Sequence, residues 1–398
     1  MEHKSFHVAV VNSHPVQYFA PLYAYLSRDA DIAVTAVYCS DSSLRGEMDP
    51  GFGQPVAWNV DLLAGYRSII LGRRARNRTP RGFFSLVCPE IWGEVRTGGY
   101  DVVWLHGYAY AAYLLAFLAA KSRRIPVFIR SETHLRLARP RWRRWLRDGV
   151  LRIAYRFVDG FLSIGSANRE YYRALGVPEA RIFNVPYTVD NDRFMAVARS
   201  LTGRRDEVRK AYGLPLDQLV VLYASKFTRR KHPDDLVAAV ARLRDDGLRV
   251  TLFLVGTGEM EAELRAAVHR RGLDDTIFAG FVNQAELPLV YAASDVFVLP
   301  SENEPWGLIV NEVMCAGLPV IVSDEVGCVP DLVRDGINGA QMKAGDVDSL
   351  VTALKSVIAD DENRRAMGRA SLEIIQDWSY ERCRLGVRDA LAALSESR

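Results

Sequence analysis

The stretch SENEPWGLIVNE, residues 301–312, joins a predicted strand to a predicted helix and decides the fold class. The apolar run before it, at 296–299, is typical of a buried strand. After it, apolar residues at helical spacing predict a helix that begins at Leu308 and ends before Gly317, and another apolar run follows at 319–322. The order strand, loop, helix, strand predicts an α/β domain with a parallel sheet.

Two carboxylates, Glu304 and Glu312, stand on either side of the expected start of this helix. The backbone N–H groups of Gly307, Leu308 and Ile309 lack partners within the helix there, and the helix dipole favours a negative charge. A ligand with phosphate groups at the helix start and hydroxyl groups on both sides satisfies this arrangement. A nucleotide-sugar has both kinds of group, so the stretch predicts a site for such a ligand.

Short apolar runs alternate with helical patterns along the chain, which predicts two doubly wound α/β domains. The runs lie at 8–11, 32–38, 102–105, 127–130, 160–164, 219–223, 250–255, 276–279, 296–299 and 319–322. Proline, Asp and Asn interrupt the pattern near 185–194, so we expect a first domain over 1–190, a second over 191–376 and a C-terminal helix within 377–398. Ligands of such sheets lie beyond the carboxyl ends of the strands, which predicts an interdomain cleft.

The composition is that of a globular protein without a strong charge bias. Of 398 residues, 49% are hydrophobic and 25% charged, and the formal net charge of +3 favours no class of partner. Five cysteines without metal-ligand spacing predict free thiols in a reducing compartment. The first strand leaves no room for a signal peptide, and no apolar run approaches the ~20 residues of a spanning helix. We expect a cytoplasmic protein, at most attached to a membrane surface.

The spacing of Glu304 and Glu312, eight positions (312 − 304), resembles the E-x7-E signature of the family-four retaining glycosyltransferases of GT-B fold, the glycosyl transferases group one. Segments that stand in that family's order lie at 280–284, 286–288, 299–301, 316–321 and 336–339. The resemblance implies two Rossmann-like domains facing a cleft, with the acceptor bound by the first domain and the nucleotide-sugar by the second. It also implies that the final helix crosses back onto the first domain.

The resemblance also implies roles for residues of the second domain. The segment SKFTRRKHP, 225–233, is similar to the family's G-R-L-x-x-x-K-G element, so Lys226 and Lys231 would clamp the donor's diphosphate. Ser225 and Lys226 depart from the family's glycine and arginine, and a lysine offers a point charge in place of a bidentate fork. Glu312 would accept hydrogen bonds from the ribose hydroxyls, while Glu304 would position the donor sugar and stabilise charge.

Three further residues of the second domain are expected near the nucleotide. Phe281 and Val282 correspond to the family's base-contacting backbone, although Phe281 could equally be a core residue. Gly256, in the segment GTGE at 256–259, resembles the family's strand exit near the nucleotide.

The first domain departs from the family in two places. Many relatives carry a Gly-Gly loop after the first strand and a His at the end of a later strand, where this chain has His14 in the segment NSHPVQY and Arg130 with Glu132 in RSETH. We expect Arg130 and Glu132 to replace that His by contacting the transferred sugar or the phosphate. His106, at another strand end, and His14 are candidate cleft residues, with a structural role as the alternative.

The triplet Asp190, Asn191 and Asp192 has the D-x-D spacing of a metal site, but its position between the domains favours a turn. Charge on a leaving diphosphate can be stabilised by lysines and helix N–H groups without a divalent cation. We therefore expect no metal dependence, and no cofactor apart from the nucleotide diphosphate-sugar that serves as donor.

A basic stretch rich in tryptophan lies between Arg136 and Arg156. Trp at the interface and Arg at the headgroups suit an anionic membrane surface. The alternative is an ordinary surface helix whose Trp side chains pack on the sheet. No nucleic-acid-binding motif accompanies the stretch, so we expect no nucleic acid partner. We expect a second basic segment, RRARNR at 73–78, to join this surface.

Together these features predict a retaining, metal-independent glycosyltransferase. It would move a sugar from a nucleotide diphosphate-sugar donor to a saccharide, lipid-linked or small-molecule acceptor. Two alternatives remain at this point: a GT-B epimerase or phosphorylase, which shares the sheets and the cleft, and a non-catalytic protein that binds a sugar nucleotide.

Overall fold

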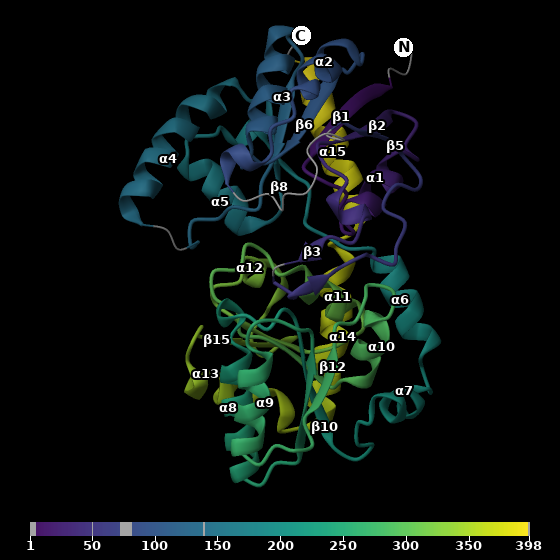
Figure 1. Cartoon of the computed structure of the whole chain (residues 1–398), viewed down its shortest axis with the longest axis vertical. Coiled ribbons are helices and arrows are strands. Elements are labelled where there is room, and N and C mark those ends of the chain that lie inside the picture. Colours follow the sequence, from purple (N-terminus) through teal and green to yellow (C-terminus); the bar gives the residue numbers. More distant parts are fainter. Residues whose placement is uncertain (1–4, 50, 72–81, 138–139, 397–398) are drawn as a thin grey trace. The chain divides into compact units, whose positions relative to one another are not determined.

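The computed structural model describes residues 5–49, 51–71, 82–137 and 140–396, and the chain divides into two compact units (Figure 1). Unit 1 comprises residues 1–47, 56–187 and 379–398, and unit 2 comprises residues 48–55 and 188–378. The limits expected from the sequence were 190/191 and 376/377. Each unit is an α/β structure built on a parallel sheet, so the expected fold class is confirmed.

The sheet of unit 1 is parallel throughout and has the strand order β5-β2-β1-β6-β7-β8-β9. Its strands are β1 (Phe6–Asn12), β2 (Ile32–Tyr38), β5 (Arg67–Ile70), β6 (Val102–His106), β7 (Val127–Arg130), β8 (Gly160–Ser163) and β9 (Ile182–Asn184). Val8 of β1 faces Val34 of β2 on one side and Val102 of β6 on the other. The chain order reverses between β1 and β6, as in a doubly wound sheet.

Helices cover this sheet, and the last helix of the chain is one of them. They are α1 (Ala20–Leu26), α2 (Glu90–Thr97), α3 (Ala111–Ser122), α4 (Arg141–Ala154), α5 (Ser166–Ala174) and α15 (Tyr380–Glu396). In Figure 1 the yellow α15 runs among the purple and blue elements of unit 1.

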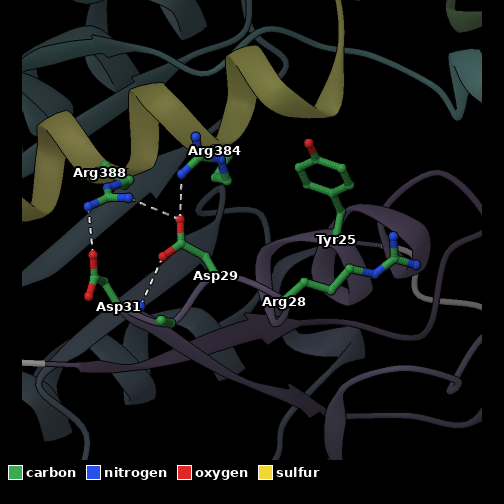
Figure 2. Close-up of a pocket in the computed structure, with 7 residues that line it drawn as sticks. Tyr25, Arg28, Asp29, Asp31, Arg384 and Arg388 are labelled. Atoms are coloured by element: carbon green, nitrogen blue, oxygen red, sulfur yellow. Dashed lines mark hydrogen bonds and ion pairs between the residues drawn. The ribbon is translucent and has the colours of Figure 1, made fainter.

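Ion pairs hold α15 against the amino end of β2, where they line a pocket of ≈ 730 Å³ (Figure 2). Arg384 donates to Asp29 at 2.6 Å, and Arg388 pairs with Asp31 at 2.6 Å. Arg28 points away from these carboxylates (Figure 2). Because ligands of parallel sheets bind at the opposite, carboxyl edge, this pocket serves to anchor the helix.

The sheet of unit 2 is also parallel, with the order β12-β11-β10-β13-β14-β15. Its strands are β10 (Leu219–Ala224), β11 (Val250–Val255), β12 (Ile277–Gly280), β13 (Val296–Leu299), β14 (Val320–Ser323) and β15 (Gly339–Met342). Most side chains of β10, β11, β13 and β14 are buried, because helices cover both faces. The chain order reverses between β10 and β13.

Nine helices of unit 2 lie within the described residues, and an Asp side chain caps three of them. They are α6 (Asn191–Ser200), α7 (Arg205–Tyr212), α8 (Pro233–Asp245), α9 (Glu261–Arg270), α10 (Leu287–Ala293), α11 (Leu308–Cys315), α12 (Val329–Leu332), α13 (Val347–Ile358) and α14 (Asp361–Gln376). The side chains of Asp190, Asp346 and Asp360 accept hydrogen bonds from first-turn N–H groups of α6, α13 and α14.

One segment belongs to a different unit than its place in the chain suggests. The antiparallel strands β3 (Met48–Asp49) and β4 (Gln54–Pro55) form a hairpin that clusters with unit 2, although the sequence placed it in a first domain over 1–190. Contacts of Asp49 and Phe52 with residues of unit 2 place the hairpin in that unit. The local sequence pattern does not predict contacts between residues so far apart in the chain.

All five cysteines are buried, and none forms a disulfide. Among the described residues, no helix combines the length and the apolar character needed to cross a bilayer.

Candidate active site

Most predicted residues of the second domain gather at the carboxyl edge of the unit 2 sheet, around β10 and β13. Adjacent parallel strands whose connections run in opposite directions leave a space between their loops, and ligands bind there. The loop after β10 contains the 3-10 turn η5 (Arg229–Lys231), and the loop after β13 leads to α11. A backbone bond from Glu302 N to Arg230 O, at 2.9 Å, joins the two loops.

Glu304 and Lys231 form an ion pair at the meeting point of these loops. Lys231 Nζ lies 2.5 Å from Glu304 Oε2, and Arg230 Nη1 lies 3.0 Å from the same oxygen. The side chains of Lys231 and Glu304 are only 11% and 14% exposed. The structure therefore brings together two residues to which separate roles were assigned, and adds Arg230, which the sequence did not single out.

Burial and charge act in opposite directions on this pair. Burial lowers the pKa of the Lys231 ammonium, and the negative charge of Glu304 opposes this shift without cancelling it. Burial alone would raise the pKa of the Glu304 carboxyl, but Lys231 and Arg230 outweigh it and hold that pKa below its ordinary value. Glu304 is therefore a carboxylate at neutral pH.

The first turn of α11 offers backbone donors at the same edge. Gly307 precedes the helix with a left-handed φ of 91°, and no side chain caps the helix start. A Cβ at Gly307 would lie 2.9 Å from Val326, so only glycine fits this turn without strain. The N–H groups of Leu308 and Ile309 lie in this first turn, as expected from the sequence.

Glu312 lies below this edge, inside unit 2, and is fully buried. Its carboxylate accepts hydrogen bonds from Gln284 Nε2 at 2.9 Å and from the hydroxyl of Tyr291. The structure gives Glu312 protein partners on both oxygens, so its contact with ribose hydroxyls stays a prediction and requires these partners to move.

Lys226, the other predicted cation, is bound by the β3–β4 hairpin. Its ammonium lies 2.8 and 2.9 Å from the two oxygens of Asp49 and 4.7 Å from the ring centre of Phe52. Phe52 also meets Phe281 edge to face, with ring centres 4.9 Å apart. Burial raises the pKa of the Asp49 carboxyl, but Lys226 reverses this and holds it below its ordinary value. The hairpin thus presents a carboxylate to the cation expected to bind a diphosphate.

The remaining predicted residues of unit 2 surround the ends of β10, β11 and β12. Gly256 has a φ of 135°, and a Cβ there would lie 2.0 Å from Ser225 O, so the two strand exits touch. Gly256 N donates to Gly280 O at 2.8 Å, directly before Phe281 and Val282, which are half-buried. Four predicted residues near strand ends, Ser225, Gly256, Phe281 and Val282, therefore share one edge of the sheet.

In unit 1 the four predicted residues His14, His106, Arg130 and Glu132 line one pocket of ≈ 470 Å³. The pocket lies at the carboxyl ends of β1, β6 and β7, where the strand order of this sheet reverses. Its aromatic lining comes from Phe19, Tyr108, Tyr110, Tyr113 and Tyr187, which the sequence analysis did not identify. The polar residues could be predicted because they stand at the ends of expected strands. The aromatic residues lie on loops and helices, where the sequence pattern does not mark them as site residues.

The histidines of this pocket are uncharged at neutral pH. Burial lowers the pKa of His14, and burial together with the charge of Arg130 lowers that of His106 well below its ordinary value. His106 Nε2 lies 2.7 Å from the hydroxyl of Tyr23, whose oxygen accepts a bond from Asn12. Which of these two atoms donates depends on the tautomer of His106.

Asp190 caps α6, and Asn191 donates to the carbonyls of Ile375 and Trp378, both at 3.0 Å. These contacts show that Asp190 and Asn191, two members of the D-x-D triplet, form the start of a helix. Among the described residues, the group with metal-ligand proximity is instead His232, Asp234 and Asp235, beside Lys231.

Helix α4 exposes an apolar face at the left margin of unit 1 (Figure 1). The strongly exposed residues are Trp142 (65%), Trp145 (79%), Leu146 (57%), Val150 (60%), Ile153 (62%) and, directly after the helix, Phe157 (60%). The alternative in which the tryptophans pack on the sheet is therefore wrong. The segment at 73–78 lies outside the described residues.

Two family models match the chain, one in each unit. The model described as "Glycosyl transferases group 1" matches residues 204–373, and that described as "Glycosyl transferase 4-like domain" matches residues 15–188. The chain superimposes on sucrose-phosphate synthase from Thermosynechococcus elongatus with a TM-score of 0.72 and 20% identity, covering 99% of this chain and 100% of that one. The two models together match most of the chain, so the fold is GT-B and the chain belongs to the group 1 glycosyl transferases.

Curated relatives are similar over part of their length. A sulfoquinovosyl transferase of Arabidopsis thaliana is 27% identical over 312 residues, 76% of this chain and 58% of that protein. A GDP-mannose-dependent alpha-(1-6)-phosphatidylinositol monomannoside mannosyltransferase of Mycolicibacterium smegmatis is 29% identical over 267 residues, 64% of this chain and 68% of that protein. The chain spans between about half and two thirds of the length of the first curated relatives it matches.

The buried ion pair leads to a stability prediction for Glu304→Ala. This change removes the carboxylate that binds Lys231 while Arg230 stays beside it, which we expect to lower the free energy of unfolding by about 3–5 kcal/mol. Burial already lowers the pKa of folded Lys231, and loss of Glu304 lowers it further, so the variant should gain more stability than the unchanged protein as the pH increases from neutral toward about 10.

Urea unfolding followed by circular dichroism at several pH values measures this effect. Glu302→Ala is the matched control, because Glu302 belongs to the same loop and its side chain is 51% exposed. Equal stability of both variants at every pH would show that Glu304 does not hold the Lys231 charge.

Proposed function

We propose that this protein is a retaining, metal-independent glycosyltransferase that uses a nucleotide diphosphate-sugar donor and a saccharide, lipid-linked or small-molecule acceptor. The observation that carries the proposal is the meeting of Lys231, Glu304 and the uncapped start of α11 at one sheet edge. Family membership supports the reaction class, and the mannosyltransferase relative is GDP-mannose-dependent by name.

In the proposed reaction, opposite charges develop on the two parts of the donor, the sugar and the diphosphate. When the bond between sugar and diphosphate breaks, negative charge grows on the phosphate and positive charge on the sugar. Lys231, Lys226 and the N–H groups of Leu308 and Ile309 would stabilise the phosphate, and the Glu304 carboxylate would stabilise the sugar. With Glu304 bound to Lys231, the leaving phosphate itself would accept the acceptor's proton, which gives retention by attack on the same face.

The alternatives differ in what they predict for products. An epimerase of the same fold would change the sugar without transferring it, and a non-catalytic binding protein would leave the donor intact. Lys231 and Glu304 are both present and paired, which favours catalysis over binding alone.

Incubation with a panel of nucleoside diphosphate-sugars tests the proposal, with NMR of the anomeric proton in each product. We expect a transferred sugar with the anomeric configuration of its donor, formed equally well in excess EDTA. An inverted product would contradict retention. Loss of activity in EDTA, restored by manganese, would point to His232, Asp234 and Asp235 as a metal site.

Lys226 provides a prediction about donor binding. If it binds the diphosphate, the phosphate oxygens must replace the carboxylate of Asp49, which now occupies both donor positions. Asp49→Asn removes the competing charge, so nucleoside diphosphates should bind about tenfold more tightly, and Lys226→Ala should bind more weakly by a similar factor.

Calorimetry with several nucleoside diphosphates measures these affinities. Asp61→Asn, on an exposed loop of unit 1, is the matched control. Weaker nucleotide binding by Asp49→Asn would contradict this prediction. It would show that the Asp49 carboxylate supports nucleotide binding and does not compete with the phosphate for Lys226.

We also propose that the exposed face of α4 docks on an anionic membrane. Arg143, Arg152 and Arg156 are exposed beside the apolar residues, and beyond the helix end Arg152 and Arg156 line a hollow of ≈ 500 Å³ together with Arg173 and Arg181. An apolar face flanked by arginines complements a bilayer with acidic headgroups. The relative that acts on phosphatidylinositol monomannoside supports a lipid-linked acceptor.

The contacts of α4 refine the test of membrane docking. Arg144 donates to Leu135 O and Arg147 pairs with Asp148, so both arginines support the local fold. Trp142→Ala with Trp145→Ala should abolish sedimentation with vesicles containing phosphatidylglycerol, whereas Trp92→Ala, an exposed tryptophan of α2, should not.

Charge reversal at Arg143, Arg152 and Arg156 should weaken sedimentation steeply, since each arginine near the surface contributes about 1 kcal/mol. Binding of the unchanged protein should also fall with added salt. Equal sedimentation with neutral and acidic vesicles, or with neither, would contradict docking on an anionic membrane.

A further inference from the structure

Arg130 is a buried cation at the end of β7, in the pocket of unit 1. Arg130 is 3% exposed. Three aromatic rings surround its guanidinium: the ring centres of Tyr187, Phe19 and Trp104 lie 5.1, 5.8 and 5.9 Å from Cζ. Arginine keeps its charge in proteins, so this position carries a permanent positive charge in an apolar setting.

The hydrogen bonds of Arg130 leave part of the guanidinium without a partner. Nη2 donates to Pro186 O at 2.9 Å and to Val185 O at 3.3 Å. Nε and Nη1 are buried and have no hydrogen-bond partner, and among the described residues no carboxylate forms an ion pair with Arg130. A buried cation that forms no ion pair destabilises a folded protein, so its presence in a pocket points to an anionic ligand.

The pocket has one carboxylate in its lining, and in the described residues it forms no ion pair with Arg130. Arg130 is the one charged base among the described residues that line the pocket, because His14 and His106 are neutral at neutral pH. The one acidic residue, Glu132, accepts a hydrogen bond from the hydroxyl of Tyr187 at 2.5 Å. The pocket therefore combines one unpaired cation with aromatic walls, which suit the apolar faces of sugar rings, and with hydroxyl and amide groups that can bind sugar hydroxyls.

We propose that Arg130 binds an anionic group, a phosphate ester or a carboxylate, on the acceptor. The acceptor is then an acidic saccharide or polyol, held by its anion on the guanidinium and by its ring among the tyrosines. This inference rests on the proposed function, since it names the acceptor class of that reaction. Nε and Nη1 of the guanidinium each have a donor available for an oxygen of a phosphate or carboxylate, and the charge strengthens such a hydrogen bond.

Thermal shift with glucose, glucose 6-phosphate and glucuronate as probes tests the proposal and separates the two anion sources. We expect the acidic probes to stabilise the protein at concentrations at least about tenfold below those that glucose requires. Preference for glucose 6-phosphate would assign a phosphate, and preference for glucuronate a carboxylate. Equal effects of all three probes would overturn the proposal.

Two variants keep this test independent of folding. Arg130→Gln removes the charge and should abolish the preference for acidic probes, whereas Arg130→Lys should keep part of it. Arg123→Gln, an exposed arginine after α3, is the matched control. Retention of the anion preference by Arg130→Gln, measured by calorimetry on a variant with a native circular dichroism spectrum, would overturn the assignment.

Binding of nucleoside diphosphates distinguishes this inference from the proposed function. Lys226→Ala, a variant in unit 2, should weaken that binding and leave the preference for acidic probes unchanged. If the unchanged protein binds acidic sugars through Arg130 but transfers no sugar from any donor, the proposed function fails and the anion site stands. If transfer occurs equally well to neutral and acidic acceptors, the anion site fails alone.

Discussion

The reversal of strand order in each parallel sheet is the constraint on which both candidate sites depend. In unit 2 the order reverses between β10 and β13, and in unit 1 between β1 and β6. Loops that leave neighbouring strands in opposite directions cannot pack fully against each other, so polar side chains collect in the space between them. The Lys231–Glu304 pair and the Arg130 pocket are the results of this one rule in the two sheets.

The two sites treat buried charge differently. In unit 2 each candidate cation has a carboxylate, Lys231 with Glu304 and Lys226 with Asp49. A negatively charged ligand must therefore exchange with a protein group, which makes binding a competition. In unit 1 the cation Arg130 has carbonyl partners alone, so an anion there would meet a charge already available. This difference between the two sites depends on side-chain contacts, which the spacing of residues in the sequence could not predict.

The sequence predicted those parts of the fold that repeat a simple pattern. Strands such as β11 and β14 are continuous apolar runs, and their positions were clear. The strands β9 and β15 were missed, because IFN and GAQM are short and partly polar. The site residues at strand ends could be named from position alone. Asp49 could not, because it meets Lys226 across 177 positions of sequence, and neither could the burial of Glu312 between Gln284 and Tyr291.

We propose that the edge of the unit 2 sheet at β10 and β13 binds the donor's diphosphate. A crystal structure with a bound nucleoside diphosphate tests it most directly. The account predicts phosphate oxygens within about 3 Å of Lys231 Nζ and of the first N–H groups of α11, with Lys226 released from Asp49. A nucleotide bound elsewhere, with the contacts of Lys231 and Lys226 unchanged, would contradict the account.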